Sequence, residues 1–175
     1  MSDSTDSKSL ASGCDADQKT APRYIVGIDL GTTNCALCWT DTEVADGEIQ
    51  TFSIAQIVSE GQTERLETLP SFHLECGGLR QQSGSCRLPW QSSGELWTTG
   101  VFARDKGRLA PGRVIESAKS WLCHPGVDRR AAILPWNGAA DVARLSPVEA
   151  SARCLQHLRE AWNSQHPQHL LEQQD

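Results

Sequence analysis

One segment restricts the fold more than any other. It is a short apolar run that ends at an aspartate and leads directly into a turn of glycine and threonine. The run covers residues 24–29 (YIVGID) and the turn covers residues 30–33 (LGTT). A second β-prone run follows at residues 34–40, and a polar turn at 41–47 leads to a third at 49–58. Because only short turns separate these runs, the pattern predicts an antiparallel meander and not a parallel β-α-β unit.

The rest of the chain predicts short elements joined by longer connections. Strands are expected at residues 69–74 and 96–101, helices at 102–109 and 114–121, a surface loop at 76–95, and turns at 125–138. The long loop carries four glycines, several serines and Pro89, and loops of this length are often functional or variable insertions.

The clearest helix signal lies near the end of the chain. Ser146 is a suitable N-cap, Pro147 fits the first helical position, and Glu149 completes a capping box. Pro167 is expected to limit the helix at its other end. Apolar residues recur at steps of three and four positions and predict its buried face: Val148, Ala152, Leu155, Leu158 and Trp162.

Composition is that of a globular protein with one main domain. The 175 residues are 38% hydrophobic and 22% charged, and no apolar run approaches the ~18–20 residues of a membrane span. The net charge of −6 argues against bulk nucleic-acid binding. Residues 1–22 are rich in serine and aspartate, which predicts a disordered tail before a domain at 23–175.

The cysteines predict reduced thiols in the cytoplasm, because their number is odd, their positions are scattered and no export signal is present. They are Cys14, Cys35, Cys38, Cys76, Cys86, Cys123 and Cys154. Cys35 and Cys38 form a C-x-x-C, but no second such motif or pair of histidines supplies further zinc ligands. Both fall in the run at 34–40, and residues three apart in a strand face opposite sides, so a structural role is favoured.

The turn after the first strand has the residue types of a phosphate site. A buried strand would carry Asp29 to the sheet edge, and Gly31 would permit a tight reversal and close approach of a ligand. Thr32 and Thr33 add amides and hydroxyls, and converging amides bind anions, while a nearby carboxylate can hold hydrated Mg²⁺. The alternative is an ordinary hairpin whose aspartate caps the turn. The segment is neither a Walker A loop nor a dinucleotide fingerprint.

The segment GIDLGTTN at residues 27–34 resembles the first phosphate motif of the heat-shock-70 (DnaK-type) chaperones, within the larger superfamily of actin, sugar kinases and chaperones. Further segments are similar to that family in the same order over residues 24–165. They are Leu69-Pro70-Ser71-Phe72, Gly100-Val101-Phe102-Ala103, Pro111, Ser117-Ala118-Lys119-Ser120-Trp121-Leu122 and Ser146-Pro147-Val148-Glu149.

The resemblance implies an α/β actin-like ATPase (ribonuclease H-like) fold that uses ATP or ADP with Mg²⁺. Asp29 would hold Mg²⁺ through water and share the catalytic role with Lys119, which matches the lysine beside the γ-phosphate. Gly31, Thr32, Thr33 and Asn34 would bind the phosphates. The implied partners are nucleotide, unfolded client proteins and co-chaperones in a stress response, with neither nucleic acid nor membrane. Lys119 is one of four lysines against twelve arginines.

The chain also departs from the family pattern. Lys119 is followed by serine where the family has arginine, and Trp121-Leu122-Cys123 replaces its usual residues, so a divergent member is expected. The family's second phosphate loop, adenosine site and peptide-binding domain have no counterpart, so we expect a first lobe that alone neither hydrolyses ATP nor holds a client. Two other interpretations remain: a sugar or acid kinase of the same superfold, and a non-catalytic interaction half-domain.

Overall fold

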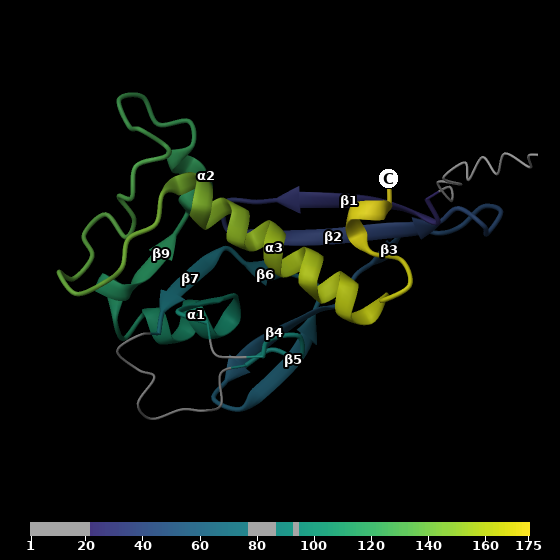
Figure 1. Cartoon of the computed structure of the whole chain (residues 1–175), viewed down its shortest axis with the longest axis horizontal. Coiled ribbons are helices and arrows are strands. Elements are labelled where there is room, and N and C mark those ends of the chain that lie inside the picture. The colour runs from purple at the N-terminus through teal and green to yellow at the C-terminus, as the bar shows by residue number, and fades with distance from the viewer. Residues whose placement is uncertain (1–21, 77–86, 93–94) are drawn as a thin grey trace, which may run out of the picture.

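A computed structural model describes residues 22–76, 87–92 and 95–175 (Figure 1). The predicted tail at 1–22 therefore lies outside the described residues except for Pro22, and so does much of the predicted loop at 76–95. The described part has a mixed α/β architecture, with antiparallel sheets of four, two and three strands and one long helix.

The first sheet confirms the predicted meander. Strands β1 (Tyr24–Leu30), β2 (Asn34–Asp41) and β3 (Gln50–Thr51) pair antiparallel in that order, and the register sets Leu30 opposite Cys35. The prediction that β1 is buried is wrong, because β1 lies at the sheet edge and Ile25 is 54% exposed. The short strand β6 (Leu69–Pro70) pairs with the start of β2.

The two strands predicted at 49–58 and 69–74 are each divided between two sheets. The first separates into β3 and β4 (Ile54–Ser59), and β4 forms a hairpin with β5 (Gln62–Leu66), which the sequence did not predict. The second breaks at Ser71 into β6 and β7 (Phe72–Glu75). Each break lets the chain leave the first sheet and pair elsewhere.

The third sheet corrects one predicted helix. Strand β7 lies between β8 (Trp97–Thr99) and β9 (Val114–Glu116). The helix predicted at 114–121 is therefore wrong over its first half, because β9 pairs with β7 there, and only α2 (Ala118–Trp121) is helical. The helix predicted at 102–109 is α1 (Val101–Gly107), which the 3₁₀ turn η1 (Pro111–Arg113) follows after a short gap.

The long helix α3 (Pro147–Gln165) begins with the predicted capping box: the Ser146 hydroxyl accepts the Glu149 amide at 3.1 Å, and the Ser146 amide donates to the Glu149 carboxylate at 2.8 Å. The predicted buried face is partly wrong, because Val148 and Leu155 are each 40% exposed. The buried face is instead made of Pro147, Ala150, Ser151, Cys154, His157, Leu158, Ala161 and Trp162.

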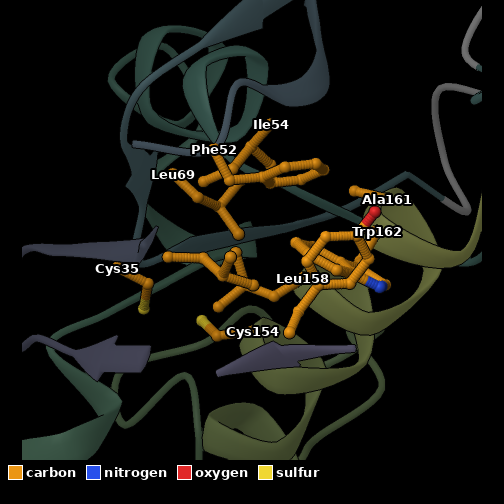
Figure 2. Packing of buried hydrophobic residues seen from close by; sticks show 10 residues of the cluster. Cys35, Phe52, Ile54, Leu69, Cys154, Leu158, Ala161 and Trp162 are labelled. Atoms are coloured by element: carbon orange, nitrogen blue, oxygen red, sulfur yellow. The ribbon is translucent and has the colours of Figure 1, made fainter. Parts of the chain in front are cut away.

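The main core lies between α3 and the first sheet (Figure 2). Trp162 is fully buried there and its indole donates to the His169 carbonyl at 2.8 Å. Leu37 from β2 and Leu158 from α3 are also fully buried. Every helix in the described part of the chain is too short or too polar to cross a bilayer.

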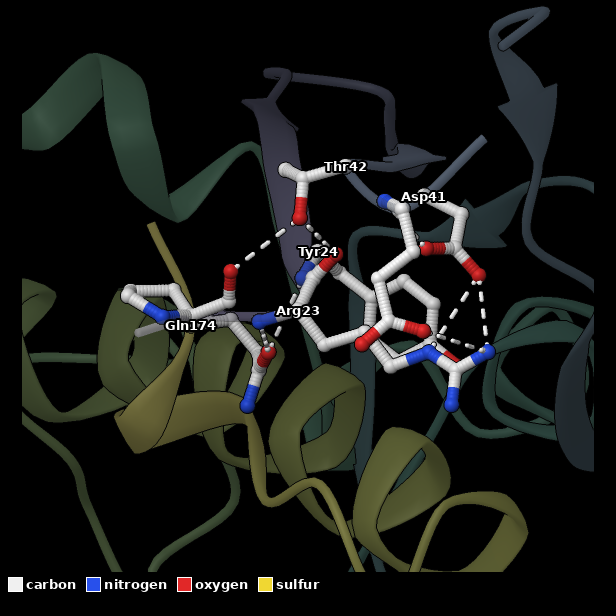
Figure 3. Close-up of polar contacts among 7 residues, drawn as sticks. Arg23, Tyr24, Asp41, Thr42 and Gln174 are labelled. Carbon is white, nitrogen blue, oxygen red and sulfur yellow. Dashed lines mark hydrogen bonds and ion pairs between the residues drawn. The ribbon is translucent and has the colours of Figure 1, made fainter. Parts of the chain in front are cut away.

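The last residues return to β1 after the turn η2 (Leu171–Gln173). The Gln174 side-chain oxygen accepts the amides of Arg23 and Tyr24, each at 3.1 Å, and Arg23 forms an ion pair with Asp41 at 3.0 Å (Figure 3). Asp175 donates to the Tyr24 carbonyl and accepts the Val26 amide. The C-terminal residues are thereby held against the outer edge of β1.

Candidate functional site

The tip of the β1–β2 hairpin has the form that the Gly-Thr-Thr turn predicts. A Cβ atom on Gly31 would lie 2.0 Å from the carbonyl oxygen of Asn34, so only glycine fits this reversal. Thr32, Thr33 and Asn34 are exposed. Their hydroxyl and amide groups can therefore meet a ligand from solvent.

Ser71 holds the hairpin from behind. Its amide donates to the Thr33 carbonyl at 2.8 Å, and its hydroxyl donates to the Gly31 carbonyl at 2.9 Å. Ser71 follows β6, which pairs with Asn34 and Cys35, so β6 sets the position of these two bonds. Sequence reasoning noted Ser71 only as part of a motif. The position of Ser71 at the break between β6 and β7 is the structural feature that indicates its role.

Lys119 lies near the hairpin, although it comes from the other half of the chain. It lies on α2, whose N-cap Ser117 has a left-handed backbone with φ of 51°. Lys119 is exposed and, among the described residues, takes part in no ion pair. It lines a small cavity together with Leu30 and Gly31 at the end of β1. The structure thus brings two of the predicted site segments together.

Asp29 is also at the end of β1 but does not line that cavity. It is exposed and pairs across the ladder with Ala36. Since side chains alternate along a strand, Asp29 is on the sheet face opposite to that of Leu30, which packs against the core. No group of three or more histidine, cysteine or acidic residues in the described ranges is placed to bind a metal ion directly.

Buried polar side chains lie beneath the hairpin, and no sequence pattern predicted them. Cys35 of β2 and Cys154 of α3 are buried in the main core, and His73 of β7 is fully buried beside Cys154. Burial, which penalises a charged imidazole, lowers the pKa of His73 to about 3, so the ring is neutral. Cys38 lies on the other face of β2, as the C-x-x-C spacing predicts, and is less buried than Cys35.

Replacing Ser71 by alanine is expected to lower the free energy of unfolding by about 1–2 kcal/mol, because it removes the hydroxyl that donates to the Gly31 carbonyl. The matched control is Ser120→Ala on the exposed side of α2, for which a change within about 0.5 kcal/mol is expected. Urea unfolding followed by tryptophan fluorescence measures both. Equal stability of the two variants would contradict the role of Ser71 as a tether.

The candidate site is therefore an exposed hairpin tip, tethered by Ser71 on one side and approached by Lys119 on the other. Asp29 stands at the end of the strand that leads into the tip, on the sheet face opposite to that of Leu30. The tip and Lys119 offer hydroxyls, backbone groups and one cation, which are groups that bind a phosphate. No protein-family model matches the sequence, and a comparison with curated proteins finds no match.

Proposed function

We propose that the β1–β2 hairpin binds the terminal phosphates of ATP, and that the chain is the first lobe of an actin-like ATPase related to the heat-shock-70 chaperones. One observation carries the proposal: Lys119 lines the same small cavity as Leu30 and Gly31, although β1 and α2 are far apart in the sequence. If the chain resembles the family in this respect, the β1–β2 hairpin and Lys119 would both lie beside the γ-phosphate.

The proposed roles follow from the chemistry of the residues. Phosphoryl transfer depends mainly on positioning and on stabilisation of negative charge. The amides and hydroxyls of Thr32 and Thr33 would hold the phosphates, and the Lys119 ammonium would orient the attacking water beside the γ-phosphate. Bound Mg²⁺ would neutralise phosphate charge. The exposed carboxylate of Asp29 fits a hydrated Mg²⁺, which usually keeps several of its waters and needs only one or two carboxylates.

The position of Ser71 favours the heat-shock-70 chaperones over the sugar and acid kinases of the same superfold. The segment Leu69-Pro70-Ser71-Phe72 resembles a heat-shock-70 strand, and Ser71 is the residue that holds both Gly31 and Thr33. A hairpin held from this strand supports the same family as the phosphate motif does. Client proteins, co-chaperones and a stress response enter the proposal through this resemblance alone, whereas a cytoplasmic location rests on the cysteine pattern.

The proposal predicts that Mg·ATP shifts the amide resonances of Thr32 and Thr33. The chain, labelled with ¹⁵N, is titrated with millimolar Mg·ATP, and AMP serves as the comparison because it lacks the terminal phosphates. Lys119→Ala is expected to weaken the response about tenfold, as loss of one charge-assisted hydrogen bond would. Asp29→Asn is expected to remove its dependence on Mg²⁺.

Lys106→Ala is the matched control for charge, because Lys106 is an exposed lysine on α1 that pairs with Glu60 at 3.4 Å. This variant is expected to respond to Mg·ATP as the unaltered chain does. Equal shifts with AMP and ATP, or shifts confined to residues outside the hairpin, would overturn the proposed phosphate site. If Lys106→Ala and Lys119→Ala weakened the response to Mg·ATP equally, the effect would come from the lower net charge and not from the position of Lys119.

A further inference from the structure

Two thiols meet in the core directly beneath the hairpin. Cys35 is the second residue of β2, and Cys154 lies in the middle of α3. Figure 2 shows their sulfur atoms pointing toward each other, and both residues belong to the main buried core. The two side chains are 0% and 2% exposed. They are therefore neighbours from two elements that come together only in the folded chain.

The pair is embedded in a line of polar groups. On one side, the sulfur of Cys35 lies 3.3 Å from the Ser71 hydroxyl, which donates to the Gly31 carbonyl. On the other side, the sulfur of Cys154 lies 3.7 Å from Nε2 of His73. Buried cysteines usually behave as small apolar side chains in apolar surroundings. These two instead contact hydroxyl and imidazole groups, so their sulfur atoms have polar partners.

Their surroundings make the two sulfur atoms chemically different. The neighbouring Cys154 thiol, the largest cause, lowers the pKa of Cys35 to about 7 despite burial. The neighbouring Cys35 and burial raise the pKa of Cys154, so Cys154 keeps its proton. A thiolate is the nucleophilic form of cysteine. Cys35 is thus the nucleophile of the pair and Cys154 its protonated neighbour.

A small cavity adjoins the Cys154 side of the pair. Cys154, His73 and Ser71 line it together with Gly31 and Lys119, and its volume is about 10 Å³. This volume is at the lower limit for one water molecule. Hydrogen peroxide is a small, uncharged oxidant of thiols, so it reaches the pair with little opening of the core, whereas a glutathione-sized reagent is too large.

We propose that Cys35 and Cys154 are an oxidation site, at which hydrogen peroxide produces a disulfide that joins β2 to α3 beneath the hairpin. The Cys35 thiolate attacks one peroxide oxygen, the O–O bond breaks, and the departing hydroxide takes a proton to form water, leaving a sulfenic acid. The Cys154 sulfur then attacks the Cys35 sulfur. The S–O bond breaks, and the hydroxyl leaves as water with the Cys154 proton. Two thiols lose two electrons in all, and one peroxide becomes two waters.

The disulfide would hold the base of the hairpin against the long helix. A cross-link between residues far apart in the sequence restricts the unfolded chain, so the oxidised form is expected to be more resistant to urea. The segment around Gly31 is bonded to Ser71 and adjoins Cys35, so its hydrogen exchange is expected to slow on oxidation. Neither consequence depends on what the hairpin binds. The oxidation site is therefore tested independently of the proposed ATPase function.

The test is treatment of the 175-residue chain with limiting hydrogen peroxide, followed by alkylation of free thiols, digestion without reductant and mass spectrometry. We expect a cross-linked peptide pair that contains Cys35 and Cys154, lacks two hydrogen atoms and disappears with dithiothreitol. Cys38→Ser is the control, because Cys38 is on the same strand but the opposite face, and it should keep the cross-link. Cys154→Ser should abolish it and leave a sulfenic acid on Cys35, which dimedone labels when the protein is denatured in its presence.

Two results would overturn the site. One is oxidation of the exposed Cys123 while Cys35 and Cys154 remain fully alkylated after denaturation. The other is a mixture of disulfides in which Cys35 has no preference for Cys154. Both are read from the unaltered chain, so the test stands even where a variant folds poorly. The increase in the urea midpoint, reversed by dithiothreitol, is an independent readout.

Discussion

Replacement of Gly31 by alanine is expected to lower the free energy of unfolding by about 3 kcal/mol, one of the two largest effects predicted for this chain. The added Cβ would lie 2.0 Å from the Asn34 carbonyl oxygen, where no carbon atom can stand. The obstructing atom belongs to the backbone of the same turn, so a side-chain rotation cannot relieve the contact. The reversal itself must open, and the carbonyls that Ser71 holds must move with it.

Gly27 is the matched control on the same strand. A Cβ atom there meets nothing within 4 Å, so Gly27→Ala is expected to change stability by less than about 1 kcal/mol, toward greater stability. Urea unfolding measures both variants, and amide spectra show whether the hairpin resonances alone are displaced. If Gly31→Ala were as stable as Gly27→Ala, the turn would not close as tightly as the structure has it.

Local signals were enough to predict the hairpin and the start of the long helix. The Gly-Thr-Thr turn between two β-prone runs and the Ser146–Glu149 capping box are each contained in a few consecutive residues. Both were confirmed, because neither depends on what the segment packs against. The start of α3 could therefore be located to the residue.

Tertiary pairing decided the elements that the sequence did not predict. Residues 62–66 (QTERL) are polar because β5 is mostly exposed, and they form a strand only through pairing with β4. Residues 114–116 are β9 because β7 lies beside them. On α3, the buried face contains Cys154 and His157, whereas the apolar Leu155 is 40% exposed, so hydrophobic spacing alone predicted the wrong rotation.

The candidate site was predictable only in part for a similar reason. The hairpin residues are consecutive, and Lys119 was selected by resemblance, so its position beside Gly31 was open to test. Ser71 and His73 act through contacts with residues more than thirty positions away in the sequence. No pattern within a short segment could reveal such contacts. The polar interior beneath the hairpin therefore emerged only from the fold.

That interior predicts a loss of stability in mild acid. His73 is fully buried, and burial first, then the charges of Arg153 and His157, lowers its pKa to about 3. Burial also lowers the pKa of His157, which donates through Nε2 to the Ala55 carbonyl at 2.9 Å. In the unfolded chain a histidine has a pKa of about 6.5. Between these two values the unfolded state binds the proton and the folded state does not.

Stability therefore rises with pH through this window and is lost as the pH falls below about 6.5. For His73 alone, the free energy of unfolding is expected to drop by about 2 kcal/mol between about pH 7 and about pH 5. His157 shifts in the same direction and adds to the loss. Most carboxylates stay ionised in this range, so they contribute little to the slope. Urea unfolding at the two pH values measures the effect.

His73→Gln is expected to remove the part of this pH dependence that comes from His73, because glutamine does not titrate. This holds whatever the substitution does to stability at neutral pH. His124→Gln is the matched control for replacing a histidine by glutamine at the surface, since His124 is exposed and stacks on Trp121. If His73→Gln does not fold, NMR of the unaltered chain still decides the matter. The His73 ring should show no protonation down to about pH 5, and titration near about 6.5 would contradict its burial as a neutral residue.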